Sequence, residues 1–581
     1  MNIHLARLCQ KARACAYAAL SILSLLLLLP TGAALAQAAP PAVAPAPAPA
    51  PAPAPSEAPR FDILEFEVEG NTVLAPELVE KAVLPFLGLQ RNLADAEAAR
   101  AALEKAYQGA GYLTVFVDLP EQRIDAGVLR LKVLEGRVER LSVTGARYYD
   151  QGRIRTAVSA LADGQVPNFN EVQRQLGGLN QREERRVQPV LRPGRLPGTV
   201  EAELQVTDRL PLGGTVELNN AAAVGTEDLR LSANLHYDNL LQREHTLALT
   251  AITTPRKPQQ IKVFVLSYGI PMAGGDSLSL YAVSSNSDVD SLGGTKVLGN
   301  GSTLGLRYAL NLAAGEGNSH NVSAGLDYKN LQERLQLGED SISKPLRYAP
   351  MQLAYGGSWS RDRAQTQLNT SFVFALRPVL ERLVDGCQRE DGSIGPQDQF
   401  RCKRKGADGG FAIWRADLRH SRALGAWWAE HLALDQVSLR ISGQFASQQL
   451  SSAEQFLLGG SETVRGYHEG AATGDHGLLG SLELRSVNFA PRLRSAFNGA
   501  LAEDLLELGL LAFIDAGSSF VIDPDLGQNR RQPLLGSGLG LRLTLRGGFS
   551  LAVDGATTHK RLSPGTAKPP SRVHLRAALR F

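Results

Sequence analysis

Hydrophobic and polar residues alternate along most of the chain between Leu212 and the last residue, Phe581. The alternation has a period of two, which places every second side chain on the same face of a β-strand. It occurs in segments of about ten residues, the length of strands that cross a bilayer, separated by Gly, Asp, Asn and Ser. The pattern predicts sixteen strands: Gly214–Asn220, Asp228–Asp238, His245–Thr253, Ile261–Ile270, Asp276–Ser285, Ser302–Asn311, Asn321–Asn330, Met351–Ser360, Gln367–Arg377, Gly410–His420, Gln436–Ser447, Leu478–Phe489, Leu505–Gly517, Leu535–Leu545, Phe549–Gly555 and Arg572–Phe581.

An even number of strands of this length is typical of an antiparallel barrel in an outer membrane. The last segment shows the pattern best, because Val573, Leu575 and Leu579 share one face while His574 and Arg576 share the other. A soluble β-sandwich would show the same alternation, with its apolar face hidden in a core. The number of strands, with no globular break between them, favours the membrane barrel.

Two stretches before the barrel repeat one order of elements. The segments FDILEFEVEG and RVERLSVTG each predict a strand that ends at a glycine, Gly70 and Gly145. Two helices and two strands then follow in each copy, so the order β-α-α-β-β occurs twice. The predicted helices are 75–86, 95–108, 150–161 and 170–179, and the predicted strands are 113–119, 128–134, 186–191 and 200–206. The alternative is a single α+β domain of about 150 residues.

The first residues have the composition of a targeting segment. Basic residues within 1–15 precede an apolar run, and Ala34-Leu35-Ala36 has the small-x-small form of a cleavage site. These features predict a secretory signal peptide over 1–36, and a membrane anchor is the alternative. Residues 37–60 are rich in Ala and Pro, which predicts an extended linker of the polyproline II type.

The predicted fold class is therefore mainly β, with a 16-stranded antiparallel transmembrane β-barrel preceded by two small α+β modules. The signal peptide places the chain beyond the inner membrane of a Gram-negative cell, with the modules in the periplasm. The predicted domains are 1–36 for the signal peptide, 37–60 for the linker, 61–136 for the first module, 137–208 for the second and 209–581 for the barrel.

Composition and motifs exclude several functions. The chain has 61 Lys and Arg against 58 Asp and Glu, and this balance does not suit a nucleic-acid binder. It contains no phosphate-binding loop, no H-E-x-x-H, no G-x-S-x-G and no C-x-x-C, and its ten His are scattered. We therefore expect no enzymatic activity, no cofactor and no metal site, and we interpret single acidic residues on the strands as the lining of a wet lumen.

One constellation within the barrel region suggests a specific contact. The connection LLGGSETVRGYHEG carries Val464, Arg465, Gly466 and Tyr467 at its centre, between the eleventh and twelfth strands. The thirteenth strand contains AFIDAG, in which Phe513, Asp515 and Gly517 share the face opposite Leu510, Ala512, Ile514 and Ala516. A loop that folds into the lumen would bring Arg465 to Asp515, since a guanidinium suits a bidentate bond with a carboxylate. An exposed surface loop and an unrelated lumen Asp explain the same pattern.

The twelfth strand adds two charged residues to this face. Glu483 and Arg485 alternate with Leu482 and Leu484, so we expect the charged pair to face the lumen.

Taken together, several stretches resemble the outer-membrane transporters of two-partner secretion, the TpsB or haemolysin secretion/activation family. Residues 111–145 and 185–206 are similar to the ends of that family's two POTRA modules. Val464–Tyr467 matches the signature of its sixth extracellular loop, which folds into the lumen. Phe513–Gly517 matches its F-x-D-x-G strand motif, whose Asp pairs with the loop Arg. The terminal Phe581 resembles the aromatic end of the signal that the barrel-assembly machinery reads.

The resemblance implies that the POTRA modules and pore export one large unfolded exoprotein of the TpsA type to the cell surface, with activation of that partner as a further expectation. Its other implied partners are the barrel-assembly machinery during biogenesis and the lipid of the outer membrane. One departure is that family members often begin with a helix that plugs the barrel, whereas 37–60 has no helical pattern. The main alternative is an insertase that assembles other barrels, although two modules rather than a longer array argue against it. A passive porin would need no POTRA module, and a secreted adhesin would not need the lumen motif.

Cys387 and Cys402 are the only cysteines after the predicted signal peptide. Both lie between the ninth and tenth strands, a connection that is extracellular if the first strand begins in the periplasm. Disulfides persist in that oxidising environment, so the two residues predict a bond that orders the loop. A metal pair is the alternative, but two thiolates supply only half of a tetrahedral zinc site.

Overall fold

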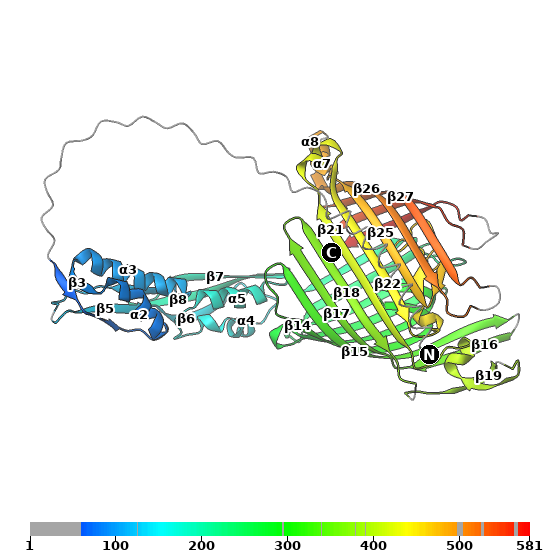
Figure 1. The fold of residues 1–581 in the computed structure, drawn as a ribbon, viewed down its shortest axis with the longest axis horizontal. Coiled ribbons are helices and arrows are strands. Elements are labelled where there is room, and N and C mark those ends of the chain that lie inside the picture. The colour runs from blue at the N-terminus through cyan, green and yellow to red at the C-terminus, as the bar shows by residue number, and fades with distance from the viewer. Residues whose placement is uncertain are drawn as a thin grey trace, which may run out of the picture.

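The structure is a computed structural model, and it divides into two small modules and a barrel (Figure 1). The predicted signal peptide, 1–36, and all of the predicted linker except Arg60 lie outside the described residues. The structure describes residues 60–124, 126–292, 295–337, 340–377, 379–389, 391–496, 503–524, 528–562 and 568–581.

The first module packs two helices against a three-stranded sheet of order β2-β5-β4. Asn92 and Asp95 begin the longer helix with a reciprocal capping box. Leu103, Tyr107 and Leu131 are fully buried between the helices and the sheet. The elements are β1 (Phe61–Ile63), β2 (Glu65–Glu69), α2 (Pro76–Val83), β3 (Gly88–Arg91), α3 (Leu93–Gly109), β4 (Val115–Asp118) and β5 (Val128–Glu135).

The second module repeats this architecture with a sheet of order β6-β8-β7. In each copy an edge strand, β2 in the first and β6 in the second, is parallel to the last strand, which is the central strand of the sheet. Gly70 and Gly145 occupy equivalent positions at φ 86° and 82°, where a Cβ would lie 2.5 and 2.2 Å from a backbone oxygen. Only glycine fits there, which confirms the predicted repeat. The elements are β6 (Arg137–Thr144), α4 (Gln151–Ala157), α5 (Phe169–Leu179), β7 (Arg185–Pro193) and β8 (Thr199–Asp208).

Most of the remaining strands form one closed antiparallel barrel, in which β29 pairs with β9. In the described residues it has sixteen strands when β16 and β17, which both pair with β15, are counted as one strand interrupted before Met351. The strands are β9 (Leu212–Asn219), β10 (Arg230–Leu240), β11 (His245–Thr253), β12 (Lys262–Pro271), β13 (Ser277–Leu292), β14 (Thr295–Leu312), β15 (Asn318–Leu337), β16 (Asp340–Tyr348), β17 (Met351–Arg361), β18 (Ala364–Phe374), β21 (Ala412–Ala423), β22 (Leu434–Ala446), β25 (His476–Ser486), β26 (Leu505–Phe520), β27 (Arg531–Leu545), β28 (Phe549–Thr558) and β29 (Arg572–Arg580).

All sixteen predicted strands are present, but three are much longer than predicted. The ladder of β13 and β14 continues to the pair Leu292–Thr295, and β15 continues to Leu337. The β13 extension is mostly polar and rich in Ser, Asn and Asp, whereas the β15 extension, LQERLQL, contains no Ser, Asn or Asp and still carries three Leu. The apolar alternation reports only the part of a strand that meets lipid, whereas backbone hydrogen bonds can continue the ladder beyond it.

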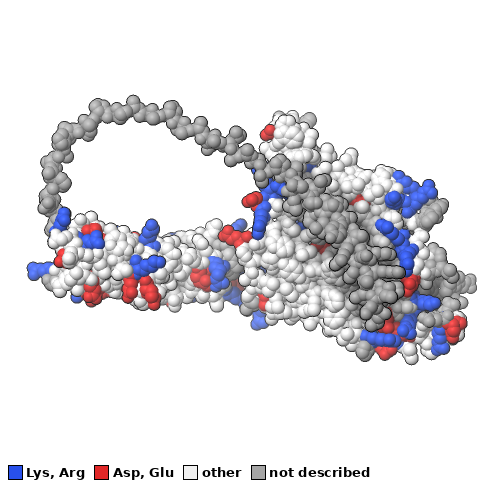
Figure 2. Space-filling model, viewed as in Figure 1, with Lys and Arg blue, Asp and Glu red and all other residues white. Residues whose placement is uncertain are grey.

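The barrel wall is apolar outside. Leu235, Leu249 and Leu266 are cross-strand neighbours on β10, β11 and β12, and all three are exposed. Figure 2 shows a wide uncharged zone on the barrel between charged residues near its two ends. Such a band is what the hydrocarbon region of an outer membrane requires.

The helices that follow the modules are short. They are α6 (Gln399–Lys403), α7 (Ala426–His431) and α8 (Ala490–Ala496). Among the described residues, no helix combines the length and the apolar character needed to cross a membrane. Helices α7 and α8 lie at one end of the barrel, and β16 and β19 (Leu383–Gln388) lie at the other (Figure 1).

Candidate functional site: a loop held inside the barrel

The connection between β22 and β25 folds into the barrel instead of standing on its surface. It contains a small hairpin, β23 (Phe456–Leu458) with β24 (Ala472–Gly474), which contacts β26. Val464 and Tyr467 are 0% and 1% exposed, and they pack with Leu479 and Leu534 of the barrel strands. The alternative of an exposed surface loop is therefore wrong.

Arg465, at the centre of this lumen loop, forms a bidentate ion pair with Asp515 on β26. Its Nε lies 2.7 Å from Asp515 Oδ2, and its Nη2 lies 2.9 Å from Oδ1. The backbone N–H of Arg465 donates to the same carboxylate at 3.1 Å, as does the hydroxyl of Ser481 at 2.6 Å. Asp515 is fully buried and Arg465 almost so. This is the ion pair that the sequence predicts.

Two further carboxylates and an aromatic ring surround the guanidinium of Arg465. Its Nη1 lies 2.8 Å from Glu483 and 3.5 Å from Asp554, a residue that the sequence analysis missed. Its Cζ lies 3.5 Å from the centroid of the Phe513 ring, which gives a cation–π contact. Arg485 reaches Glu483 at 3.6 Å, so both residues face the lumen as expected. One cation thus holds together β25, β26 and β28.

Glycines allow the loop to approach the wall closely. Gly466 has φ 96°, and its N–H donates to His574 Nε2 at 2.9 Å. A Cβ on Gly536 would lie 2.1 Å from the backbone oxygen of Arg465, and one on Gly517 would lie 3.0 Å from Leu458. The role of Gly517 in the predicted motif is therefore to leave room for the loop to pack, and not to form a hydrogen bond.

Tyr467 anchors the loop to the extracellular part of the wall. Its hydroxyl donates to the Lys560 carbonyl at 2.8 Å and accepts from the Lys560 N–H at 3.1 Å. It also lies 3.2 Å from the Leu535 carbonyl oxygen.

The descending part of the loop is bound to a different part of the wall, through Glu454. This buried carboxylate contacts Lys329 of β15 at 2.5 Å, Tyr348 of β16 at 2.7 Å and Arg415 of β21 at 3.0 Å. Since Arg465 is bound to β25, β26 and β28, the loop runs across the lumen between these two groups of strands. Glu454 could not be found from the sequence, because a single acidic residue in a loop carries no periodic signal.

Asp475, at the neck of the loop, is a second centre that sequence analysis missed. Its carboxylate pairs with Arg404 at 2.5 and 3.0 Å and accepts the N–H groups of Leu450 and Ile522 at 2.9 and 2.8 Å. Leu450 is at the other root of the lumen loop, Arg404 lies between β18 and β21, and Ile522 lies between β26 and β27. Asp475 therefore joins three extracellular connections.

The predicted disulfide is present, between Cys387 of β19 and Cys402 of α6. β19 pairs with β20 (Ile394–Asp398) in a hairpin that the sequence did not predict. Cys402 is two residues from Arg404, so the disulfide holds the segment that reaches Asp475. Its role in ordering the loop stays a prediction.

The terminal Phe581 completes the closure of the barrel. Its N–H donates to Gly214 and its carbonyl accepts from Gly214, both at 3.0 Å. Its ring lies over Gly214, where a Cβ would be 2.7 Å from Cζ, and it is 64% exposed on the outside of the wall. Its role as an assembly signal stays a prediction.

No group of three or more His, Cys, Asp and Glu side chains in the described part of the chain is arranged to hold a metal ion. The carboxylates near Arg465 are engaged by guanidinium groups instead, since Arg542 also reaches Asp554 at 2.5 Å. The lumen loop is therefore held at this site by ion pairs, which can break and form again.

Comparison with known proteins decides between a secretion pore and other barrels with the same fold. Residues 198–543 match the family model described as haemolysin secretion/activation protein ShlB/FhaC/HecB, and residues 61–136 match the ShlB-type POTRA domain. The chain belongs to this family. It is a TpsB-type transporter of two-partner secretion, located in the outer membrane with its POTRA modules in the periplasm, and not an enzyme.

Curated relatives of this TpsB-type chain are outer-membrane transporters. The outer membrane transporter CdiB of Escherichia coli O6:K15:H31 is 24% identical over 439 residues, which are 72% of this chain and 68% of that protein. The heme/hemopexin transporter protein HuxB of Haemophilus influenzae strain 86-028NP is 21% identical, over 69% of this chain and 67% of its own length.

Solved structures share the fold of the TpsB-type chain. CdiB from Escherichia coli matches with a TM-score of 0.58 and 19% identity, over 91% of this chain and 92% of that one. BamA from Haemophilus ducreyi lacking POTRA domains 1–3 matches with a TM-score of 0.51 and 15% identity, over 90% and 100%. At these identities the likeness concerns the fold alone.

Proposed function

We propose that the chain captures one large unfolded exoprotein of the TpsA type in the periplasm and exports it through the barrel to the cell surface. We propose the domain division 61–136, 137–208 and 209–581 for these tasks, namely two capture modules and the pore. The main support for the proposal is the lumen loop. Arg465 holds this loop through charge and hydrogen bonds, so the loop can be displaced without breaking a covalent bond.

Capture by strand addition needs a sheet edge with free backbone groups. The β7 edge of the second module is a poor template. Asn180 bonds both the N–H and the carbonyl of Val187, and Pro189 and Pro193 have no N–H to offer. The β4 edge of the first module is also partly covered, since Glu104 accepts the N–H of Val117 and Arg100 donates to its carbonyl.

The β2 edge of the first module is the more open one. Glu65 pairs with Val128 in a parallel ladder and donates its N–H to Gly127, so alternate residues of β2 bond to β5. The backbone groups of Phe66 and Val68 then face away from the sheet. Among the described residues, no loop or side chain bonds these groups.

The exposed face of β2 indicates which segments it would favour. Glu65, Glu67 and Glu69 alternate along it, and Arg130 of β5 pairs with Glu67 at 2.7 Å. An added strand with Lys or Arg at alternate positions would lie next to these carboxylates. We therefore propose that the first module captures a basic extended segment of the exoprotein.

No nucleotide-binding motif is present in the sequence, so the direction of transport needs another source. Folding of the exoprotein outside the cell would prevent its return, and we propose that this folding biases transport outward. Activation of the exported partner stays a prediction.

Deletion of residues 61–205 tests the proposed function. Export of the partner exoprotein should stop, while the barrel from Leu212 onward still assembles and shows the heat-dependent gel mobility of a closed barrel. Continued export would place capture in the barrel and contradict the proposal. Loss of other outer-membrane barrels on deletion of the whole chain would favour the alternative of an insertase.

Proline substitution tests the edge separately. Val68→Pro removes an outward N–H from β2 and should reduce capture, whereas Leu191→Pro does the same on the blocked β7 edge and should not. A photo-crosslinker at Glu67 should join the partner exoprotein, and one at Val117 should not. Equal crosslinking from both positions would contradict the assignment to β2.

A further inference from the structure

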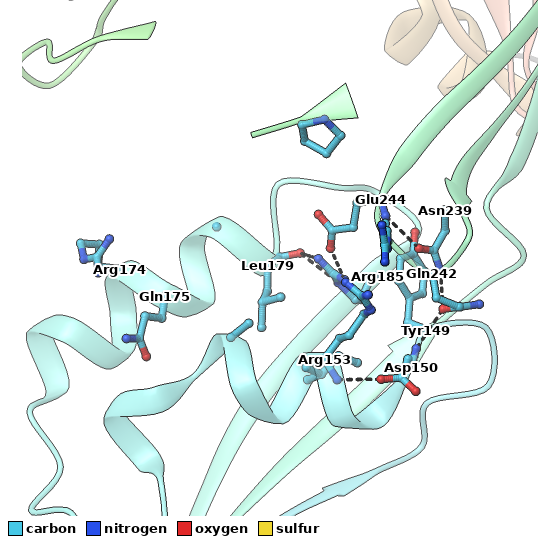
Figure 3. A pocket seen from close by; sticks show the side chains of 15 residues that line it. Tyr149, Asp150, Arg153, Arg174, Gln175, Leu179, Arg185, Asn239, Gln242 and Glu244 are labelled. Atoms are coloured by element: carbon cyan, nitrogen blue, oxygen red, sulfur yellow. Dashed lines mark hydrogen bonds and ion pairs between the residues drawn. The ribbon is translucent and has the colours of Figure 1, made fainter. Parts of the chain in front are cut away.

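A cavity of about 580 Å³ lies where the second POTRA module meets the barrel (Figure 3). Pockets of this size commonly bind small molecules. Helices α4 and α5 form one side of it, and the β10–β11 turn and Pro271 of β12 form the other. Apolar side chains line part of it, among them Ile154, Ala157 and Leu179.

The junction around the cavity is held by specific bonds. Arg185 pairs with Glu244 at 2.6 Å, donates to the Leu179 carbonyl at 2.7 Å and lies over the Tyr149 ring at 4.6 Å. Asn239 donates to the Tyr148 carbonyl at 3.1 Å, and Gln242 accepts the N–H of Asp150 at 3.0 Å. The cavity is thus a feature of a fixed junction rather than a gap between separate domains.

More basic than acidic residues line the cavity. Four arginines and two acidic residues line it, and Arg185 and Arg174 are already paired, with Glu244 and Glu171 respectively. Arg153 and Arg243 are exposed, and neither guanidinium forms an ion pair or hydrogen bond with any residue in the described ranges. Two free guanidinium groups at one cavity suit a phosphate.

Tyr149 supplies a second, independent sign of a ligand. It lines the cavity, is 5% exposed, and its hydroxyl has no hydrogen-bond partner among the described residues. An unsatisfied buried polar group is rare in folded proteins. Burial raises the pKa of Tyr149 to about 12, so the hydroxyl keeps its proton and can donate.

The cavity also lies at the depth of lipid headgroups. Tyr237, Leu247 and Tyr268 are in register on β10, β11 and β12, on the same outward face as the exposed Leu235 and Leu266. Aromatic residues on the lipid face mark the membrane interface. The β10–β11 turn follows just beyond this level, on the side of the POTRA modules.

The β10–β11 turn places an apolar side chain in a strained backbone conformation. Leu241, Gln242 and Glu244, three of the four residues of this turn, have φ 59°, 56° and 59°, a region that favours Gly and Asn. A Leu in this conformation is strained, because its Cβ lies too close to the following carbonyl oxygen. Leu241 is 68% exposed and Met272 of the next turn is 46% exposed, as expected of side chains that enter lipid.

We propose that this cavity holds the headgroup phosphate of a glycerophospholipid from the periplasmic leaflet of the outer membrane, between Arg153 and Arg243. The acyl chains lie along Leu241 and Met272. The bound lipid fixes the second POTRA module relative to the barrel and the membrane. An acidic protein segment could bind the same arginines. It would not explain why Leu241 is exposed in the turn or why the site lies at the depth of the lipid headgroups.

Native mass spectrometry of the delipidated full chain, titrated with phosphatidylglycerol, tests the proposal. The double variant R153Q/R243Q should bind the first lipid at least tenfold more weakly. R174Q removes an arginine of the same cavity that is already paired, and it should bind as the unaltered protein does. Equal binding by the double variant and the unaltered protein would overturn the proposal.

Two further experiments identify the ligand. Leu241→Asn relieves the turn and removes the hydrocarbon contact, so it should weaken lipid binding while heat-dependent gel mobility stays normal. Glycerophosphoglycerol, which has the headgroup without chains, should not displace the lipid at equal concentration. If it does, or if a poly-glutamate peptide binds more tightly than lipid through Arg153 and Arg243, the ligand is not a membrane phospholipid and the proposal fails.

Discussion

Arg465 and Asp515 lie 50 residues apart in the chain, and their side chains meet through two parallel hydrogen bonds of 2.7 and 2.9 Å inside the barrel. The bidentate geometry defines the position of the loop, because Asp515 is fixed on a strand and Arg465 belongs to the loop. Removing one partner of a buried pair leaves the other charge uncompensated, at a cost of about 3–5 kcal/mol.

Arg465→Ala should therefore reduce export strongly while the barrel still assembles. Four acidic or aromatic contacts of the guanidinium are lost together, and Asp515, Glu483 and Asp554 are left close to one another. Export of the partner exoprotein and heat-dependent gel mobility are the two measurements. Arg485→Ala is the matched control, since Arg485 is half-exposed and its ion pair with Glu483 is weak. Normal export by Arg465→Ala would show that the pair has no role in transport.

Gly536→Ala should displace the loop without removing a charge. The added Cβ would lie 2.1 Å from the backbone oxygen of Arg465, so the loop must move away from β27. Gly480→Ala, on β25, is the control because a Cβ there meets nothing within 4 Å. Protease accessibility of the loop from outside the cell should rise in the first variant alone, and an unchanged cleavage pattern would be evidence against the close packing.

Arg404→Gln should loosen the neck of the loop. The buried Asp475 would lose its only bidentate partner among the described residues and keep two backbone N–H donors. We expect a larger single-channel conductance in planar bilayers, as three extracellular connections separate. Arg401→Gln alters an exposed arginine of helix α6, which ends just before Arg404, and should leave conductance unchanged. Equal conductance in both variants would contradict the role of Asp475.

Loss of the disulfide should also raise the single-channel conductance. Its ends are 15 residues apart, and a closed loop of this size contributes roughly 3 kcal/mol by constraining the unfolded chain. Replacing both Cys387 and Cys402 with Ser should free α6 and weaken the contact of Arg404 with Asp475. The effect on conductance should not add to that of Arg404→Gln, because the two changes release one contact. Additive effects would show that the disulfide acts elsewhere.

The sequence predicted the parts of this molecule that repeat or alternate. Sixteen membrane strands followed from period-two alternation, and the inward direction of Asp515 followed from its place between Ile514 and Ala516. The family motif then supplied its partner in the loop. Each of these depends on a local pattern that the chain order preserves.

The remaining contacts were beyond sequence analysis for a physical reason. Arg404 and Asp475 are 71 residues apart, and Lys329 and Glu454 are 125 apart. Each is a single charged residue in a polar segment, where nothing in the local pattern separates a buried ion pair from a solvated side chain. The extension of β13 was not predicted because its residues are mostly polar, so the alternation of hydrophobic residues fades although the backbone ladder continues.

Two neighbouring positions on β10 distinguish a path of the exoprotein through the lumen from a path along the outer wall. Asn234 faces the lumen, and Leu235 is 45% exposed on the lipid face beside Leu249. A photo-crosslinker is placed at each position in turn, and export of the partner exoprotein is arrested part-way. We predict crosslinks from position 234 and none from position 235. Crosslinks from position 235, or none from 234 while the arrested chain spans the membrane, would contradict it.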